Sequence, residues 1–158
     1  YTRGTQVHVN EFENYIGKEL NAMLNGDYYV YDVLELETNG RLSAFTHHGP
    51  GRGKGANEGN PMRTWLKNIY YDALNDRRRA PDIVYTGHVH DPTYNTYVYR
   101  NGMNFETMHG VILPSWQMKT TFGYKVAPMS RNKIGGVYHD ILADGTISTP
   151  QFCVMDTE

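Results

Sequence analysis

Apolar residues at the start of the chain recur first at helical spacing and then at strand spacing. Residues 11–24 are predicted to form a helix with one apolar stripe, made of Phe12, Ile16, Leu20 and Met23 or Leu24. Asn10 can cap this helix, and Glu13 follows three residues later, as in a capping box. Residues 28–36 then alternate in the manner of a strand.

Two short strands are predicted, and a segment that contains histidines follows each of them. The first covers residues 41–46, and the second covers residues 83–86, an apolar run typical of a buried strand. Between them, a glycine-rich, mobile surface loop over residues 49–60 leads into a helix that begins near Pro61. The apolar repeat of that helix predicts its buried face, formed by Met62, Leu66, Ile69 and Ala73.

The remainder of the chain is predicted to be rich in β-structure. The strands expected there cover residues 95–100, 105–113, 136–142 and 146–154. Asp144 and Gly145 suit a hairpin turn between the last two. The order of elements predicts an α/β fold with a sheet covered by helices on one side. No repeat or linker divides the chain, so one domain is expected over residues 1–158.

The two strand ends that precede histidines indicate a metal site. His47 and His48 follow the first strand, and Gly87, His88 and His90 follow the second. Ligand sites of α/β sheets gather at the carboxyl ends of strands, so neighbouring strands would bring three or four imidazoles together. If the chain stays extended, His88 and His90 point to the same side. Imidazole nitrogen is a ligand that suits Zn, Fe and Mn.

An interpretation without metal stays open at this point. A lone histidine at a strand end is usually a hydrogen-bonding residue, and His109 and His139 are predicted to be of this kind. A single His-x-His also occurs by chance in exposed strands. Two histidine clusters, each with a glycine and each behind an apolar strand, favour metal binding slightly over chance.

Composition limits the classes of function. The 158 residues suffice for one domain with a hydrophobic core, and 39% hydrophobic with 20% charged residues indicates a globular chain. A net charge of −2 argues against a wholly basic nucleic-acid-binding surface. No apolar run approaches the roughly 20 residues that cross a bilayer, so no membrane partner is expected. The single cysteine, Cys153, excludes an internal disulfide and fits a cytoplasmic location.

The histidine segments resemble two motifs of the calcineurin-like metallophosphoesterases. Gly87-His88-Val89-His90 is similar to the closing Gly-His-x-His motif of that superfamily. Thr46-His47-His48-Gly49 is similar to the preceding motif, in which a strand ends in a ligand histidine. Within the superfamily, the chain is most similar to phage- and prophage-type phosphoesterases, on the segments Arg3–His8, Pro114–Gln117 and Gly135–Gly136. The resemblance covers nearly the whole chain.

This resemblance implies a fold and a set of site residues. The fold would be a four-layer αββα sandwich, to which the chain contributes a mixed sheet with helices on one face. His47 and His88 would be ligands of one divalent metal ion, and His90 would be a ligand of a second. His8 would be a catalytic residue that helps to protonate the leaving group. The two ions would be Mn, Fe or Zn.

Two carboxylate motifs of the superfamily, Asp-x-His and Gly-Asp-x-x-Asp, are not found in the chain. Gly26 and Asp27, followed by Asp32, have the wrong spacing for the second motif. Both motifs would precede Tyr1, so the expectation is that residues 1–158 form the C-terminal half of a metallophosphoesterase domain. Such a chain alone would be nearly inactive. The missing N-terminal half or a partner chain would cover one of its faces.

The implied reaction is hydrolysis of a phosphomonoester or a phosphodiester, with nucleotides and nucleic acids among the candidate substrates. Two metal ions would bind the phosphate and lower the pKa of a bridging water. Positive charge and aromatic rings near the substrate are expected from Arg52, Lys54, Trp116, Lys119 and Tyr124. For the aromatic members, packing within the β-rich tail is an equal alternative to stacking on bases.

Two other classes of protein are alternatives to a phosphoesterase. Metallo-β-lactamase-like hydrolases use His-x-His-x-Asp-His, whereas here Asp91 follows His90 directly, which counts against that class. The other alternative is a catalytically incomplete, phage-associated module that binds nucleic acid or has a structural role. The missing carboxylates suit this alternative, while the three matching histidines favour an enzyme.

Overall fold

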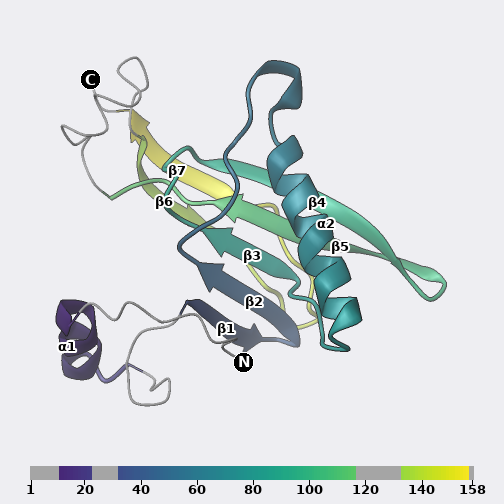
Figure 1. The fold of residues 1–158 in the computed structure, drawn as a ribbon, viewed down its shortest axis with the longest axis horizontal. Helices are drawn as coiled ribbons and strands as arrows, with labels where there is room; N and C mark the ends of the chain where they lie inside the picture. Colours follow the sequence, from purple (N-terminus) through teal and green to yellow (C-terminus); the bar gives the residue numbers. More distant parts are fainter. Residues whose placement is uncertain (1–10, 23–31, 117–132, 157–158) are drawn as a thin grey trace. The chain divides into compact units, whose positions relative to one another are not determined.

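The computed structural model describes residues 11–22, 32–116 and 133–156 of the chain. Its elements, drawn in Figure 1, are α1 (Glu11–Glu19), β1 (Val33–Thr38), β2 (Arg41–Thr46), the 3-10 helix η1 (Gly55–Asn57), α2 (Asn60–Asn75), β3 (Ile83–Thr86), β4 (Thr93–Asn101), β5 (Asn104–Ile112), β6 (Lys133–Tyr138) and β7 (Gln151–Asp156). Residues 1–34 and 35–158 form two separate compact units. In the described part of the chain, no helix has the length and apolarity needed to cross a membrane.

Five strands of the chain form a mixed sheet in the order β1-β2-β3-β5-β4. β2 is parallel to β3, and β3 is parallel to β5, whereas β4 and β5 form an antiparallel hairpin. The predicted α/β class and mixed sheet are therefore confirmed. Because β2, β3 and β5 run in the same direction, they end at one edge of the sheet, which we call the carboxyl edge.

Helix α2 lies across one face of this sheet (Figure 1). Met62, Leu66 and Ala73 of the predicted stripe are buried, and the first two pack with buried residues of the sheet: Ala44, Val84, Met108 and Ile112. Helix and sheet approach closely at Gly110, where a Cβ atom would lie 2.5 Å from the Met62 sulfur. A larger residue at this position would require the side chains of Met62 and Leu66 to shift.

A hairpin of β6 and β7 packs against the opposite face. Ile83 and Tyr85 alternate with Val84 along β3, so they face away from α2. They form a second core cluster with Val111, against which partly buried apolar residues of the C-terminal segment pack: Val137, Ile141, Ile147 and Phe152. The five-stranded sheet is thus covered by a helix on one face and by a two-stranded sheet on the other.

The C-terminal strands differ from the predicted ones. The predicted turn at Asp144 and Gly145 is present, with the Gly145 N–H donating to the Leu142 carbonyl. However, β6 ends at Tyr138 and β7 begins at Gln151, so the predicted strand ranges 136–142 and 146–154 were wrong in extent. The connection between them bonds to the five-stranded sheet instead, through Asn39 to the Ile141 carbonyl and Arg41 to the Gly145 carbonyl.

The boundaries in the first half also shift. Helix α1 ends at Glu19, five residues before the predicted end, and residues 23 and 24 lie outside the described residues. Residues 28–31 of the predicted strand over 28–36 lie outside the described residues, and the strand that overlaps its end, β1, covers Val33–Thr38. Strands β2 and β3 have the predicted bounds. Part of the predicted loop over 49–60 is folded into η1, and α2 begins at Asn60.

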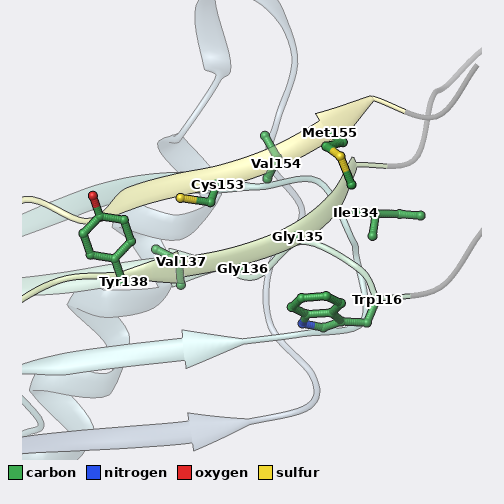
Figure 2. Close-up of a pocket in the computed structure, with 9 residues that line it drawn as sticks. All are labelled: Trp116, Ile134, Gly135, Gly136, Val137, Tyr138, Cys153, Val154 and Met155. Atoms are coloured by element: carbon green, nitrogen blue, oxygen red, sulfur yellow. The ribbon is translucent and has the colours of Figure 1, made fainter.

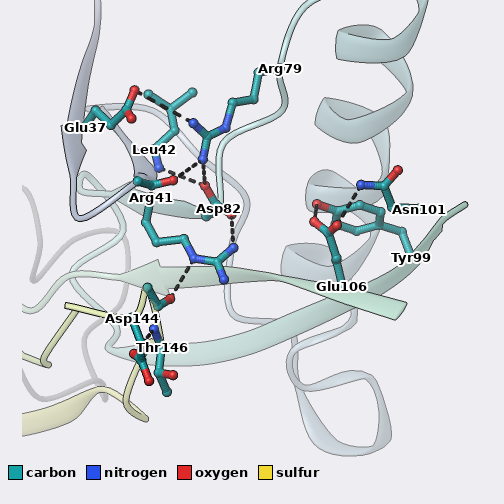
Figure 3. Close-up of polar contacts among 12 residues, drawn as sticks. Glu37, Arg41, Leu42, Arg79, Asp82, Tyr99, Asn101, Glu106, Asp144 and Thr146 are labelled. Atoms are coloured by element: carbon teal, nitrogen blue, oxygen red, sulfur yellow. Dashed lines mark hydrogen bonds and ion pairs between the residues drawn. The ribbon is translucent and has the colours of Figure 1, made fainter. Parts of the chain in front are cut away.

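Buried Asp82 joins β2, β3 and the segment after α2 (Figure 3). Its carboxylate accepts a hydrogen bond from the Leu42 backbone N–H at 2.8 Å. It also pairs with Arg41 at 2.9 Å and with Arg79 at 2.8 Å. A buried carboxylate is tolerated where charge-assisted hydrogen bonds replace its hydration. Asp82 is therefore expected to stabilise the start of β3, the strand that leads to His88.

Two histidines on the hairpin side of the sheet predict an acid-sensitive fold. His109 Nδ1 bonds to the Tyr94 hydroxyl at 2.8 Å, and His139 Nε2 bonds to the Tyr85 hydroxyl. Burial lowers the pKa of both histidines below the ordinary value of 6.5. The folded state therefore binds fewer protons than the unfolded chain, and stability present above roughly pH 6.5 is lost as the pH falls through that value.

We expect the free energy of unfolding of the full-length protein, measured by urea denaturation, to fall between pH 7.5 and pH 5.5. The reason is that burial disfavours protonation of His109 and His139 in the folded state, so at the lower pH the unfolded chain binds more protons. In the variant His139→Gln, which keeps a hydrogen-bonding side chain for Tyr85 but cannot titrate, the fall should be smaller. Equal pH dependence in the variant and the parent would show that His139 does not contribute.

Candidate metal centre

Parallel pairing of β2 and β3 brings two histidine segments together at the carboxyl edge. Thr46 and Thr86, the last residues of the two strands, are register partners. The Gly87 N–H continues the pairing by donating to the Thr46 carbonyl at 3.3 Å. Gly49 also allows close approach, since a Cβ there would lie 2.2 Å from Thr86 Oγ1. His47 and His88 therefore follow the ends of adjacent strands, at the same height along the strand direction.

Three imidazole side chains converge at this point. His47 Nε2 and His88 Nδ1 are 3.2 Å apart. One ring nitrogen from each of His47, His48 and His88 lies within 4.8 Å of the others. The ring centroids of the three pairs are 4.7, 4.7 and 5.1 Å apart, with interplanar angles of 60 to 81°. We call this group the histidine cluster.

One pair of nitrogens in the histidine cluster has the spacing of two ligands of a transition-metal ion. Zn–N bonds of about 2.0–2.1 Å in a tetrahedral site place two ligand nitrogens roughly 3.3–3.4 Å apart. The 3.2 Å between His47 Nε2 and His88 Nδ1 is close to that edge. His47, His48 and His88 are all exposed, so water or a substrate can reach the site. Three protein ligands with an open position are typical of catalytic rather than structural zinc sites.

The His-x-His segment is not extended. Both His88, at φ 61°, and His90, at φ 57°, adopt left-handed backbone conformations. The Val89 N–H bonds back to the Gly87 carbonyl at 2.7 Å, which makes a tight turn. Such conformations are uncommon outside glycine and often occur at functional sites. The alternation expected for an extended segment is therefore absent, and His90 is not a member of the histidine cluster.

His48, to which the resemblance gave no role, is the third member of the histidine cluster. In the sequence, only its place next to His47 marked His48. Neighbouring residues of an extended strand point to opposite sides, so an extended segment would have kept these two rings apart. β2 ends at Thr46, so residues 47 and 48 are free of that alternation. Their rings lie edge to face, and both contact His88.

Arg52 holds the loop after β2 rather than presenting a free positive charge. Its guanidinium pairs with Glu58 and, at 2.9 Å, with Asp91. The hydrogen bond that the guanidinium donates to Glu58, and after it the one donated to Asp91, raises the pKa of Arg52. Arg52 thus ties this loop to the residue that follows His90. Lys54, another predicted substrate-binding residue, is exposed next to the start of η1.

The remaining predicted site residues lie apart from the histidine cluster or outside the described part of the chain. Trp116 is 83% exposed and lines a pocket beside β6 and β7 (Figure 2). His8, Lys119 and Tyr124 are outside the described residues. His109 and His139 lie on the hairpin side of the sheet, where each bonds to a tyrosine.

Comparison with known proteins assigns no family to the chain. No family model matches, and no curated protein matches. Among solved structures, the chain is similar to the Thermotoga maritima protein TM1076, determined by NMR, with 16% sequence identity and a TM-score of 0.34. The match covers 86% of this chain and 64% of that protein, so the chain spans less than two thirds of its length.

Proposed function

We propose that this chain is part of a metal-dependent phosphoesterase that hydrolyses a phosphomonoester or a phosphodiester. The observation that carries the proposal is the histidine cluster, in which three exposed imidazoles meet at the carboxyl edge with a spacing that fits a metal ion. The sequence resemblance to calcineurin-like metallophosphoesterases supplies the reaction class. A cytoplasmic location belongs to the same proposal, because the chain has a single cysteine.

The histidine residues have distinct roles in this proposal. His47, His48 and His88 hold one divalent ion. His90, which follows the tight turn from Gly87 to Val89, is a ligand of a second ion. His8 protonates the leaving group. Bound divalent ions polarise the phosphoryl group and lower the pKa of bound water.

The proposal requires carboxylates in addition to the histidines. The histidine cluster contains no Asp or Glu among the described residues. A dinuclear hydrolytic site commonly has a bridging carboxylate between ions about 3.5–4 Å apart. In the proposed αββα sandwich, the carboxylates come from an N-terminal half outside residues 1–158, or from a partner chain that covers one face. The 158-residue chain alone is therefore expected to be nearly inactive.

Metal removal tests the proposed reaction. The full-length protein, stripped with a chelator, is expected to lose hydrolysis of an aryl phosphodiester and an aryl phosphomonoester, and Mn²⁺ should restore it. The measurement is release of the aryl alcohol at limiting and saturating Mn²⁺. Activity that survives complete metal removal would contradict the proposal. Metal binding without hydrolysis of either ester would favour the alternative, a catalytically incomplete module.

A further inference from the structure

Residues 133–156, which we call the C-terminal cover, meet the sheet at two partly buried histidines. His139 directly follows β6, and its Nε2 atom bonds to the Tyr85 hydroxyl of β3, with the two rings edge to face at 5.6 Å between centroids. His109 of β5 bonds through Nδ1 to the hydroxyl of Tyr94, at 2.8 Å, and Tyr94 packs against the same apolar cluster as the cover. The first bond therefore joins the C-terminal cover to the sheet, and the second lies within the face that the cover packs against.

A positive charge on His139 has little to stabilise it while the C-terminal cover is in place. Its Nδ1 atom is buried and makes no hydrogen bond with a described residue. Burial lowers the pKa of His139, and the Ser148 backbone and the Asp140 carboxylate, which favour the protonated ring, only partly offset that effect. The attached cover therefore favours a neutral His139.

His109 adds to this preference. Burial lowers its pKa, and a charge on His139 lowers it further. The carboxylate of Asp82 acts in the opposite direction, and the charge of Arg41 lowers the pKa again, to a smaller extent. Protonation of one histidine therefore disfavours protonation of the other as long as the C-terminal cover holds the two rings near each other.

The opposite face of the sheet has a core of its own. Beneath α2, Met62 and Leu66 belong to one buried cluster. The C-terminal cover packs against the other cluster, formed by Ile83, Tyr85 and Val111. Release of the cover would expose the second cluster to water and leave the first one buried.

We infer that the C-terminal cover is a pH-sensitive element, whose release from the folded sheet and α2 is favoured as the pH falls from 7.5 to 5.5. After release, both imidazoles reach water and regain the ordinary pKa of about 6.5, so the released state binds more protons and acid favours it. At pH 5.5 such a free imidazole is protonated about ten to one, so each histidine shifts the release equilibrium by up to about tenfold. Neither histidine belongs to the histidine cluster, so this release is independent of the proposed hydrolysis.

Amide hydrogen exchange of the full-length protein at pH 7.5 and pH 5.5 measures the release. Protection factors, which correct for the pH dependence of exchange itself, should be lower in β6 and β7 than in α2 at both pH values, because the cover opens without global unfolding. In β6 and β7 they should fall by about 10- to 100-fold between the two pH values. His139→Gln and His109→Gln, which keep a hydrogen-bonding side chain but cannot titrate, should each remove up to about tenfold of that fall, and the double variant should remove it.

Three results of this experiment would overturn the inference. Equal protection of β7 and α2 would show that the C-terminal cover opens only with the whole fold. Protection of β6 and β7 that is the same at both pH values would show that release is not linked to protons. A fall that both glutamine variants leave unchanged would assign the two histidines a purely structural role. If the variants do not fold, NMR titration of the parent protein decides, since midpoints of both imidazoles at or above about 6.5 would also contradict the inference.

Discussion

In the full-length protein, His88→Ala is expected to lower Mn²⁺-dependent hydrolysis by at least about 100-fold. Loss of residues that only orient a metal ligand already costs roughly 10–100-fold, and this substitution removes a ligand outright. His88 lies 3.2 Å from His47 at the centre of the histidine cluster and is exposed, so its removal leaves the hydrophobic core untouched. The measurement is the rate at limiting and saturating Mn²⁺.

Two further variants separate ligand loss from disturbance of the backbone. His88 has a left-handed backbone conformation, which alanine adopts less readily than histidine. His47 does not have this conformation. His47→Ala should therefore reproduce the loss without that strain. His139 lies on the hairpin side of the sheet, bonds to Tyr85 and is not a member of the histidine cluster, so His139→Gln should retain most of the activity. Wild-type rates for His88→Ala at limiting Mn²⁺ would remove this residue from the catalytic centre.

Asp82→Ala is expected to lower the free energy of unfolding by about 2–3 kcal/mol. Breaking a fully buried ion pair costs roughly 3–5 kcal/mol, and the partial exposure of Arg41 and Arg79 reduces that figure. The substitution also leaves the Leu42 N–H without the carboxylate oxygen that it bonds at 2.8 Å. Urea denaturation at pH 7.5 measures the change.

The same ion network offers its own controls. Glu37, whose side chain is 61% exposed, reaches Arg79 at 3.8 Å, so Glu37→Ala should cost less than about 0.5 kcal/mol. Asp82→Asn keeps an acceptor for Leu42 but loses the charge, and its cost should fall between the other two. If Asp82→Ala and Glu37→Ala had equal effects, the network around Asp82 would not stabilise the start of β3.

Local patterns predicted the elements that position the site. The bounds of β2 and β3 and the buried face of α2 followed from apolar runs and helical periodicity, because each of these elements buries one continuous surface. The rule that strand ends gather ligands also anticipated that His47 and His88 would meet. These features depend on contacts between neighbours in sequence or on the general geometry of parallel strands.

Features set by tertiary contacts escaped prediction. The left-handed turn at His88 and His90 takes His90 out of line with His88, and no local signal distinguished this turn from an extended His-x-His. The short extents of β6 and β7 arise because Arg41 and Asn39, about a hundred residues earlier, bond the intervening segment. The ion pair of Arg52 with Asp91 likewise joins residues that are 39 positions apart. Because of this pair, Arg52 does not present the free positive charge that was expected.

An anomalous diffraction map of crystals of the full-length protein grown with Mn²⁺ would locate the metal ion that the three imidazoles are proposed to hold. The histidine cluster predicts a peak within bonding distance of His47 Nε2 and His88 Nδ1, with His48 as the next protein ligand. Crystals in which Mn²⁺ occupies another site while the three imidazoles remain metal-free would contradict a metal centre at the histidine cluster.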